Sequence, residues 1–173
     1  IIGNYAFKSC LSLQKAIIPE GVTKIGLEAF KGCSSMTQIY LPDSLSIVGS
    51  GAFGVCNALT SVEIPAHIQE TVTSGNMSAY YGIFRDCQNL ATITFRSGIQ
   101  KIPGGIFAGI TGLETITIPN TVTEIEHDAF LECTNLKTVN FSTNLKIIGN
   151  YAFKSCASLQ KAIISEGVTK IGL

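Results

Sequence analysis

Apolar residues recur along this chain at a fixed spacing, and phenylalanine marks the repeat most clearly. The successive steps between seven of the phenylalanines are 23, 23, 31, 23, 23 and 23 residues. A period of this size is typical of a solenoid, in which each coil packs its apolar side against its neighbours. We therefore predict one solenoid domain over residues 1–173. The anchor phenylalanines are Phe7, Phe30, Phe53, Phe84, Phe107, Phe130 and Phe153.

Positions counted from each anchor predict one strand per coil. The residues at plus nine and plus eleven are apolar and alternate with polar neighbours, as Val62 and Ile64 do. This alternation indicates a half-buried strand. Proline follows directly in several coils and ends the strand, because proline cannot donate to a ladder of hydrogen bonds. Apolar residues at plus fifteen and plus eighteen, such as Val122 and Ile125, predict a second short segment on another wall.

The segment around each anchor has a different pattern. Alanine or isoleucine precedes the phenylalanine, and cysteine usually follows three residues later. This spacing predicts one short helical turn. Glycine stands four residues before several anchors, as at Gly26 and Gly49, where we expect a tight bend that uses its conformational freedom. The predicted fold class is an α/β repeat solenoid of about seven 23-residue coils, with a parallel β-sheet on one face and short helical turns on the other.

The repeated unit resembles a known family. Residues 113–118 read Leu-Glu-Thr-Ile-Thr-Ile, which is the L-x-x-L-x-L core of a leucine-rich repeat. Together with the following I-P-x-x-V-x-x-I and A-F-x-x-C patterns, the unit looks like the BspA-type leucine-rich repeat of bacterial and protist surface proteins. The resemblance covers essentially the whole chain. It implies an adhesin-like protein, at the cell surface or secreted, that binds a host matrix protein or a cell-surface protein or glycan.

A longer repeat joins the two ends of the chain. Residues 1–27 and 147–173 match at 25 of 27 positions. Neighbouring coils differ freely at surface positions, so a tandem duplication explains this identity best. We expect the chain to be a fragment of a longer array.

Composition and motifs exclude several function classes. Lys plus Arg and Asp plus Glu both number 12, so the formal net charge is zero. A neutral chain lacks the basic surface that nucleic acids require, and no apolar run approaches the roughly 18 residues of a membrane span. No catalytic, phosphate-binding or zinc motif is present. We expect no enzyme activity, cofactor, nucleic-acid partner or membrane insertion.

The six cysteines share one position, three residues after the anchor, where the seventh coil has Ile110. A position that accepts isoleucine indicates a buried free thiol, because free cysteine is among the most buried residue types. No Cys-x-x-Cys pair or histidine cluster accompanies them. We therefore expect neither a disulfide framework nor a metal site.

Candidate binding residues lie at the polar positions of the predicted strands, which form the face that solenoids often use for binding. Tyr40 is the strongest single candidate, because exposed tyrosine is enriched in recognition surfaces. The threonines are compatible either with a polar recognition strip or with a simple stacked ladder, since threonine suits strands in any case. The strand-face candidates are Gln38, Tyr40, Glu63, Thr92, Thr94, Thr115, Thr117 and Asn140.

The single step of 31 residues indicates an eight-residue insertion, expected as a loop at about 70–79. Insertions in repeat arrays map to loops and often carry function. Met77, Tyr80 and Tyr81 form an apolar cluster there that either contacts a ligand or covers the core. Our leading hypothesis is a non-enzymatic binding module that presents the sheet and this loop. The alternative is a structural spacer or a stalk that associates end to end or laterally.

Overall fold

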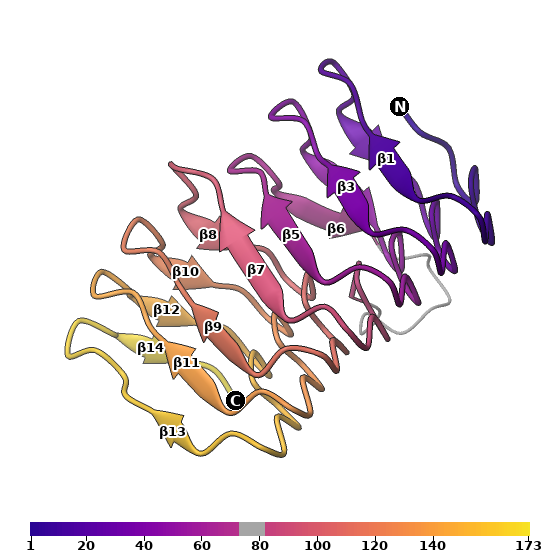
Figure 1. Cartoon of the computed structure of the whole chain (residues 1–173). Helices are drawn as coiled ribbons and strands as arrows, with labels where there is room; N and C mark the ends of the chain where they lie inside the picture. The colour runs from indigo at the N-terminus through magenta and orange to yellow at the C-terminus, as the bar shows by residue number, and fades with distance from the viewer. Residues whose placement is uncertain (73–81) are drawn as a thin grey trace.

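The computed structural model describes residues 1–72 and 82–173, which form a parallel β-solenoid of about six turns (Figure 1). The expected seven coils are an overcount, because seven anchors bound only six complete turns. The N and C termini lie at opposite ends of the stack (Figure 1). The solenoid itself and its parallel strands agree with the repeat pattern.

The odd-numbered strands form the first wall. They are the strands predicted at plus eight to plus eleven, and they pair in parallel with a register that keeps equivalent positions side by side, as Ala16 with Ile39 and Val139 with Ile116. Hydrogen bonds divide this wall into three sheets, β1-β3, β5-β7 and β9-β11-β13. The strands are β1 (Lys15–Ile17), β3 (Gln38–Tyr40), β5 (Ser61–Ile64), β7 (Thr92–Phe95), β9 (Thr115–Thr117), β11 (Thr138–Asn140) and β13 (Lys161–Ala162).

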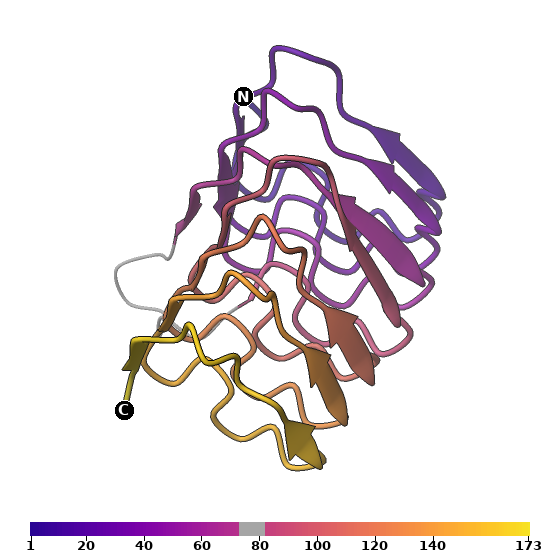
Figure 2. The ribbon, with the colours of Figure 1, turned by 90° about the vertical axis from the view of Figure 1, so that its left-hand side faces the viewer.

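The even-numbered strands form the second wall, on the other side of the core (Figure 2). They correspond to the second segment predicted in each coil. This wall consists of two sheets, β2-β4-β6 and β14-β12-β10-β8. The strands are β2 (Lys24–Ile25), β4 (Ile47–Gly49), β6 (Glu70–Val72), β8 (Lys101–Ile102), β10 (Glu124–Ile125), β12 (Ile147–Ile148) and β14 (Lys170–Ile171).

The predicted helical turns are wrong: no residue that the structure describes is helical. At six of the seven anchors, all except Phe84, the residues two positions before and after the phenylalanine instead have a left-handed conformation. Glu28 and Gly32, two residues before and after Phe30, have φ of 48° and 75°. The N–H groups of residues 28, 30 and 32 donate to the carbonyls of residues 50, 52 and 54 in the next coil, at 2.7–3.0 Å. An α-helix needs consecutive right-handed residues and i−4 acceptors, and this ladder between coils replaces both.

The glycines that precede the anchors serve a different purpose from the bend that we expected. Gly26 and Gly49 do not have positive φ. A Cβ added at Gly49 would lie 2.4 Å from the amide nitrogen of Leu27. At Gly26 it would lie 2.6 Å from the amide nitrogen of Asn4. Glycine is therefore required here because the backbones of successive coils approach each other too closely for a side chain.

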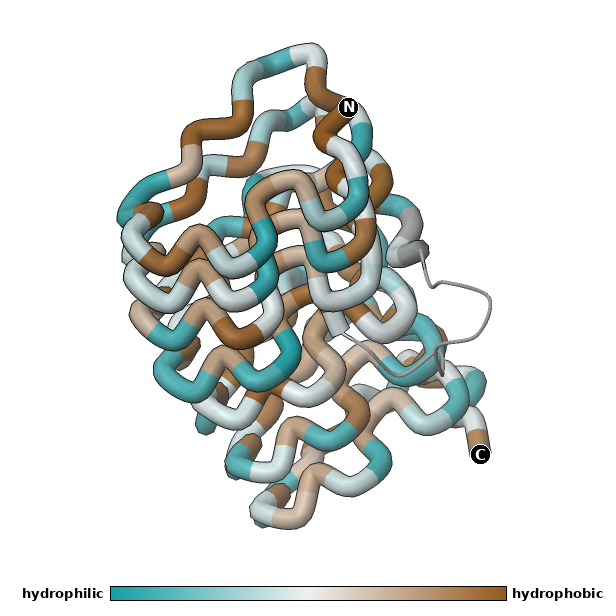
Figure 3. The backbone as a smooth tube through the Cα atoms, turned by 90° about the vertical axis from the view of Figure 1, so that its right-hand side faces the viewer, coloured by the Kyte–Doolittle hydropathy of each residue, from teal (hydrophilic) through white to brown (hydrophobic). Residues whose placement is uncertain are grey.

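The core is one continuous cluster that runs the length of the stack. The anchor rings pack face to face in two series, Phe7 to Phe84 and Phe107 to Phe153, with centroids 4.9–5.5 Å apart. Between the series, the ring of Phe95 packs edge-on against Phe107 at 6.0 Å. Hydrophobic and hydrophilic segments recur from coil to coil and run along the stack (Figure 3). Repetition of one small set of contacts thus builds the whole core.

Candidate functional site

The first wall presents alternate side chains to solvent, as the strand pattern predicts. All eight strand-face candidates, from Gln38 to Asn140, are exposed, while the residues between them contribute to the core. The odd-numbered strands carry them across the broad face seen at the front of Figure 1. Their role in binding stays a prediction. Because this wall consists of three sheets, the candidates are distributed over three separate sections and do not form one continuous strip.

Tyr40 lies at the end of β3 with half of its surface exposed, at 50%. The Nζ atom of Lys15, on the neighbouring strand β1, lies 5.1 Å from the centre of the tyrosine ring. A cation at this distance from an aromatic face is attracted to the ring. The contact restricts the ring's freedom, while half of the side chain stays exposed. Tyr40 is therefore a pre-positioned aromatic group on the exposed face.

Arg96 was not among the predicted residues, but it connects three coils of this face. Its guanidinium pairs with Asp43 at 2.6 Å and with Glu63 at 3.0 Å, and it donates to the carbonyl of Leu41 at 2.8 Å. The hydrogen bond with Asp43, followed by that with Glu63, raises the pKa of Arg96. These contacts of Arg96 with Leu41, Asp43 and Glu63, here called the Arg96 clamp, span the interruption between β3 and β5. Glu63 is therefore already paired with a residue of this chain. A signal existed in the sequence, since Arg96 occupies the position of Pro19, Pro42, Pro65 and Pro119.

The polar side chains of β7, β9 and β11 are partly engaged with one another. The Nδ2 atom of Asn140 donates to the Thr117 hydroxyl at 3.0 Å. This contact supports the stacked ladder for these two residues. Thr92, Thr94 and Thr115 present exposed side chains on β7 and β9. For these three, the ladder and the recognition strip both stay predictions.

The insertion is located more narrowly by strand register than by sequence. Residues 70–72, which we expected within the loop, form β6 and pair with β4 at the regular 23-residue offset. From Gly82 onward the offset from the preceding coil is 31 residues, since the Gly82 carbonyl accepts a hydrogen bond from the Gly51 N–H. The extra residues therefore lie between Val72 and Gly82. Met77, Tyr80 and Tyr81 lie outside the described residues, so their proposed contacts stay predictions.

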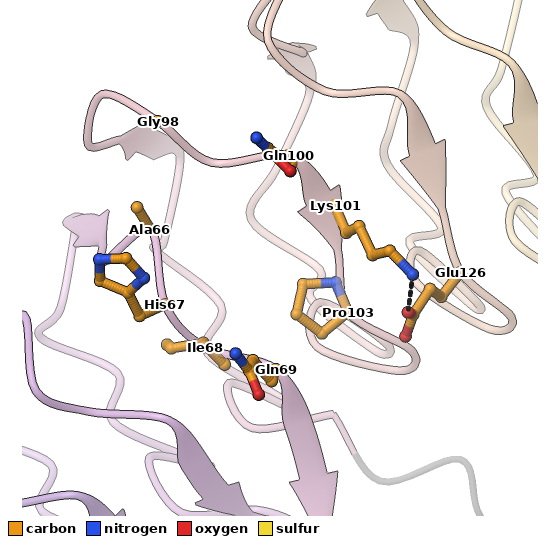
Figure 4. A pocket seen from close by; sticks show the side chains of 9 residues that line it. All are labelled: Ala66, His67, Ile68, Gln69, Gly98, Gln100, Lys101, Pro103 and Glu126. Carbon is orange, nitrogen blue, oxygen red and sulfur yellow. Dashed lines mark ion pairs between the residues drawn. The ribbon is translucent and has the colours of Figure 1, made fainter.

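A groove opens on the second wall between β8 and the segment 66–69 that leads into β6, and sequence reasoning missed it. Its volume is about 510 Å³. Figure 4 shows its lining from three successive coils, with His67 and Gln69 on one side, Gln100 and Lys101 on the other, and Glu126 beyond Lys101. Lys101 pairs with Glu124 at 2.9 Å, and its Nζ atom lies 3.7 Å from Glu126. The groove is consequently polar but close to neutral.

His67 and His127 are both exposed and lie in turns. His127 Nδ1 lies 3.1 Å from Asp128 Oδ2, and the buried Oδ1 atom of Asp128 has no hydrogen-bond partner. Over residues 1–72 and 82–173, no three His, Cys, Asp or Glu side chains are arranged to hold a metal ion. The same residues include no helix that could cross a membrane.

The cysteine position forms a ladder of thiol hydrogen bonds. Five of the six thiols, all except that of Cys10 in the first coil, donate to the carbonyl of the anchor phenylalanine in the preceding coil, as Cys133 does to Phe107 at 3.2 Å. The same type of carbonyl also accepts the N–H of the cysteine three residues later, as in Cys33 to Phe30. Cysteine thus occupies the second acceptor site of this carbonyl. Ile110 fills the same space without the hydrogen bond, which explains why the position tolerates it.

Thiol labelling is expected to separate Cys10 from the other cysteines. Cys10 is exposed, whereas Cys33, Cys56, Cys87 and Cys133 are buried. Burial raises the pKa of Cys87 to about 12 and that of Cys156 to about 11, so at pH 8 both remain protonated and unreactive. A water-soluble disulfide reagent at pH 8 should label one thiol per native chain quickly, as measured by intact mass. The Cys10→Ser variant should lose this label, and rapid labelling of Cys87 would contradict the buried ladder.

Comparisons with known proteins agree on one architecture. The family model for the BspA type leucine rich repeat region matches this chain in six copies, over residues 1–75 and 78–173. A leucine-rich repeat protein of T. pallidum is 26% identical with a TM-score of 0.67, and the alignment covers 92% of this chain and 71% of that one. A comparison with curated proteins gives no significant match.

Two further solved structures are longer than this chain. A leucine-rich repeat protein of Eubacterium ventriosum is 23% identical with a TM-score of 0.70, and the alignment covers 92% of this chain and 41% of that one. A leucine-rich repeat protein of Bacteroides ovatus is 23% identical with a TM-score of 0.64, and the alignment covers 99% of this chain and 49% of that one. The chain therefore spans less than half the length of either protein.

Proposed function

Because the chain belongs to the BspA-type leucine-rich repeat family, we propose that it is a non-enzymatic binding module, at the cell surface or secreted. Its ligand is a host matrix protein, or a protein or glycan of another cell surface. The exposed side chains of the first wall make the contact. The observation that carries this proposal is the position of Tyr40, which is half-exposed on the first wall and lies next to the ammonium group of Lys15.

The physical argument rests on preorganisation. A tyrosine supplies a large contact area with few rotatable bonds, so little conformational entropy is lost when it binds. The contact with Lys15 lowers this cost further. Gln38 on the same strand offers an amide group, and the threonines of β7 and β9 offer hydroxyl groups on the other two sections of the wall. A rigid aromatic surrounded by polar groups is the usual composition of a recognition surface.

A structural spacer is the alternative. The continuous core and the stacked anchor rings support it, since they give the stack a regular and well-packed interior. A spacer needs a rigid body but no particular side chain on its surface. Self-association, end to end or lateral, is a variant of the same function. Loss of binding through a single surface substitution therefore separates a binding module from a spacer.

Replacement of Tyr40 by alanine is expected to weaken ligand binding at least tenfold. A central aromatic contact typically contributes enough free energy for a loss of this size. The measurement is surface plasmon resonance against immobilised fibronectin, laminin, fibrillar collagen and a glycan panel. Tyr151→Ala is the matched control, because Tyr151 is 43% exposed and also contacts a lysine, Lys154, but lies on the anchor side of the coils. Equal losses in both variants, or no binding by the unmodified chain, would count against the proposal.

A further inference from the structure

Two strand edges face each other across an interruption in the second wall. In the described part of the chain, β6 pairs with β4, and β8 pairs with β10. One sheet ends at β6 and the next begins at β8, although the two strands belong to successive coils. An unpaired edge presents a row of N–H and C=O groups that can pair with another chain. The groove is lined by residues 66–69, which lead directly into β6, and on the other side by Gln100 and Lys101, at the start of β8 (Figure 4).

Pro103 explains why β8 does not pair with β6. It stands at the position where other coils have a residue whose N–H donates to the strand of the preceding coil. Proline has no N–H and cannot make this bond. At the 31-residue offset between these coils, the position equivalent to Pro103 is Val72. In the other coils the N–H donates to the carbonyl one residue before the equivalent position, so the carbonyl left without this donor is that of Thr71. The equivalent donors elsewhere are Gly26, Glu126, Gly149 and Gly172, which bond to the preceding coil at 2.7–3.0 Å.

The two coils still touch at one end of the interruption. The Thr71 hydroxyl donates to the carbonyl of Gly104, just beyond Pro103. At the other end the coils are separated by the groove, which Ala66, His67 and Gln69 line on one side and Gly98, Gln100 and Lys101 on the other. The interruption is therefore a wedge, closed at Thr71 and open at its wide end. Its volume, about 510 Å³, lies within the range of roughly 300–1,000 Å³ that is usual for ligand sites.

We propose that this groove binds an extended peptide segment of a partner protein, which adds as a strand between β6 and β8. Strand addition takes its affinity from main-chain hydrogen bonds. Among the described strands, β6 and β8 each pair with a strand on one side only. Exposed Gln69 and Gln100 flank the groove and offer further amide groups to the peptide. This inference concerns the second wall and does not depend on the proposed function of the first.

The charges at the groove favour main-chain recognition over binding of a charged ligand. The ammonium group of Lys101 is already paired with Glu124 and lies near Glu126. Glu126 in turn accepts a hydrogen bond from the Gly104 N–H at 3.0 Å. A polyanion or a strongly cationic ligand would thus find no unpaired charge on these residues. An extended segment with a neutral, polar surface fits this lining best.

The test uses a fluorescent, end-capped peptide that copies residues 120–126 with glutamine in place of Glu124 and Glu126, because this segment contains a natural strand, β10, and the two changes make the peptide neutral. Fluorescence polarisation should show saturable binding to the whole chain. A peptide methylated on alternate backbone nitrogens keeps the side chains but loses main-chain donors, and it should bind at least tenfold more weakly. Hydrogen exchange should show new protection at residues 67–71 and 100–102.

Pro103→Gly provides the matched variant. It restores the missing N–H, so β8 should pair with β6, and affinity for the peptide should fall at least tenfold. Pro119→Gly, at the end of β9, is the control and should bind like the unmodified chain. Equal binding of the methylated peptide would overturn the proposal. Protection confined to β2 or β14, or unchanged affinity in Pro103→Gly, would also overturn it.

Discussion

Replacement of Phe107 by alanine is expected to lower the free energy of unfolding by about 3–5 kcal/mol. The Phe107 side chain is fully buried. Its ring lies 5.2 Å from the ring of Phe130 and 6.0 Å from that of Phe95, so the substitution would remove contacts with two coils at once. The neighbouring coils cannot close the cavity freely, because backbone hydrogen bonds such as Phe107 N–H to the Ala129 carbonyl fix their separation.

Urea unfolding monitored by circular dichroism measures this loss. Phe7→Ala is the matched control, because Phe7 is 43% exposed and stacks on Phe30 alone among the anchors. Its loss should be less than half that of Phe107→Ala. Hydrogen exchange should show earlier opening of β9 and β10 in the Phe107 variant. A loss below about 1 kcal/mol would mean that the anchor position is not the energetic centre of the core.

The repeat period predicted the solenoid and the strand positions, because burial in a stack imposes the same pattern on every coil. Val62 and Ile64 lie inward on β5, and Glu63 between them lies outward, as alternation requires. The conformation around the anchors was not predictable from the same pattern. Val55 has φ of 58°, which its β-branched side chain disfavours. The N–H of Val55 donates to the Arg85 carbonyl in the next coil, and contacts between coils of this kind override local preference.

Part of the candidate surfaces was likewise predictable from the sequence, and part was not. Alternation placed Tyr40 and the threonines on the exposed face, since a strand directs successive side chains to opposite sides. It did not reveal the Arg96 clamp or the groove at Pro103. Both residues differ from those at the same position in other coils. Several other coils have proline at the Arg96 position, and most have glycine at the Pro103 position. The consensus of a repeat therefore indicates the scaffold, whereas departures from it indicate where the scaffold is interrupted.

Substitution of the glycine four residues before an anchor is expected to have the second large effect on stability. Gly49→Ala is expected to lower the free energy of unfolding by about 3 kcal/mol. The new Cβ would lie 2.4 Å from Leu27 N and 2.5–2.7 Å from the carbonyl carbon and oxygen of Gly26. These are backbone atoms, so the clash is relieved only if β4 moves away from β2, which would break their pairing. Overpacking in a well-packed region typically costs about 1–3 kcal/mol, and loss of the pairing places this variant at the upper end.

Gly3→Ala tests the same position without the clash. A Cβ at Gly3 has no atom within 4 Å, and its φ is not positive. Alanine should stabilise this site slightly, by about 0.4–1 kcal/mol, because it restricts the unfolded chain. The two substitutions are chemically identical and occupy equivalent positions, so opposite signs in thermal or urea unfolding would isolate the contact between coils as the cause. A stabilising or neutral Gly49→Ala would show instead that the coils can separate at little cost, and close backbone packing would then not explain the glycine.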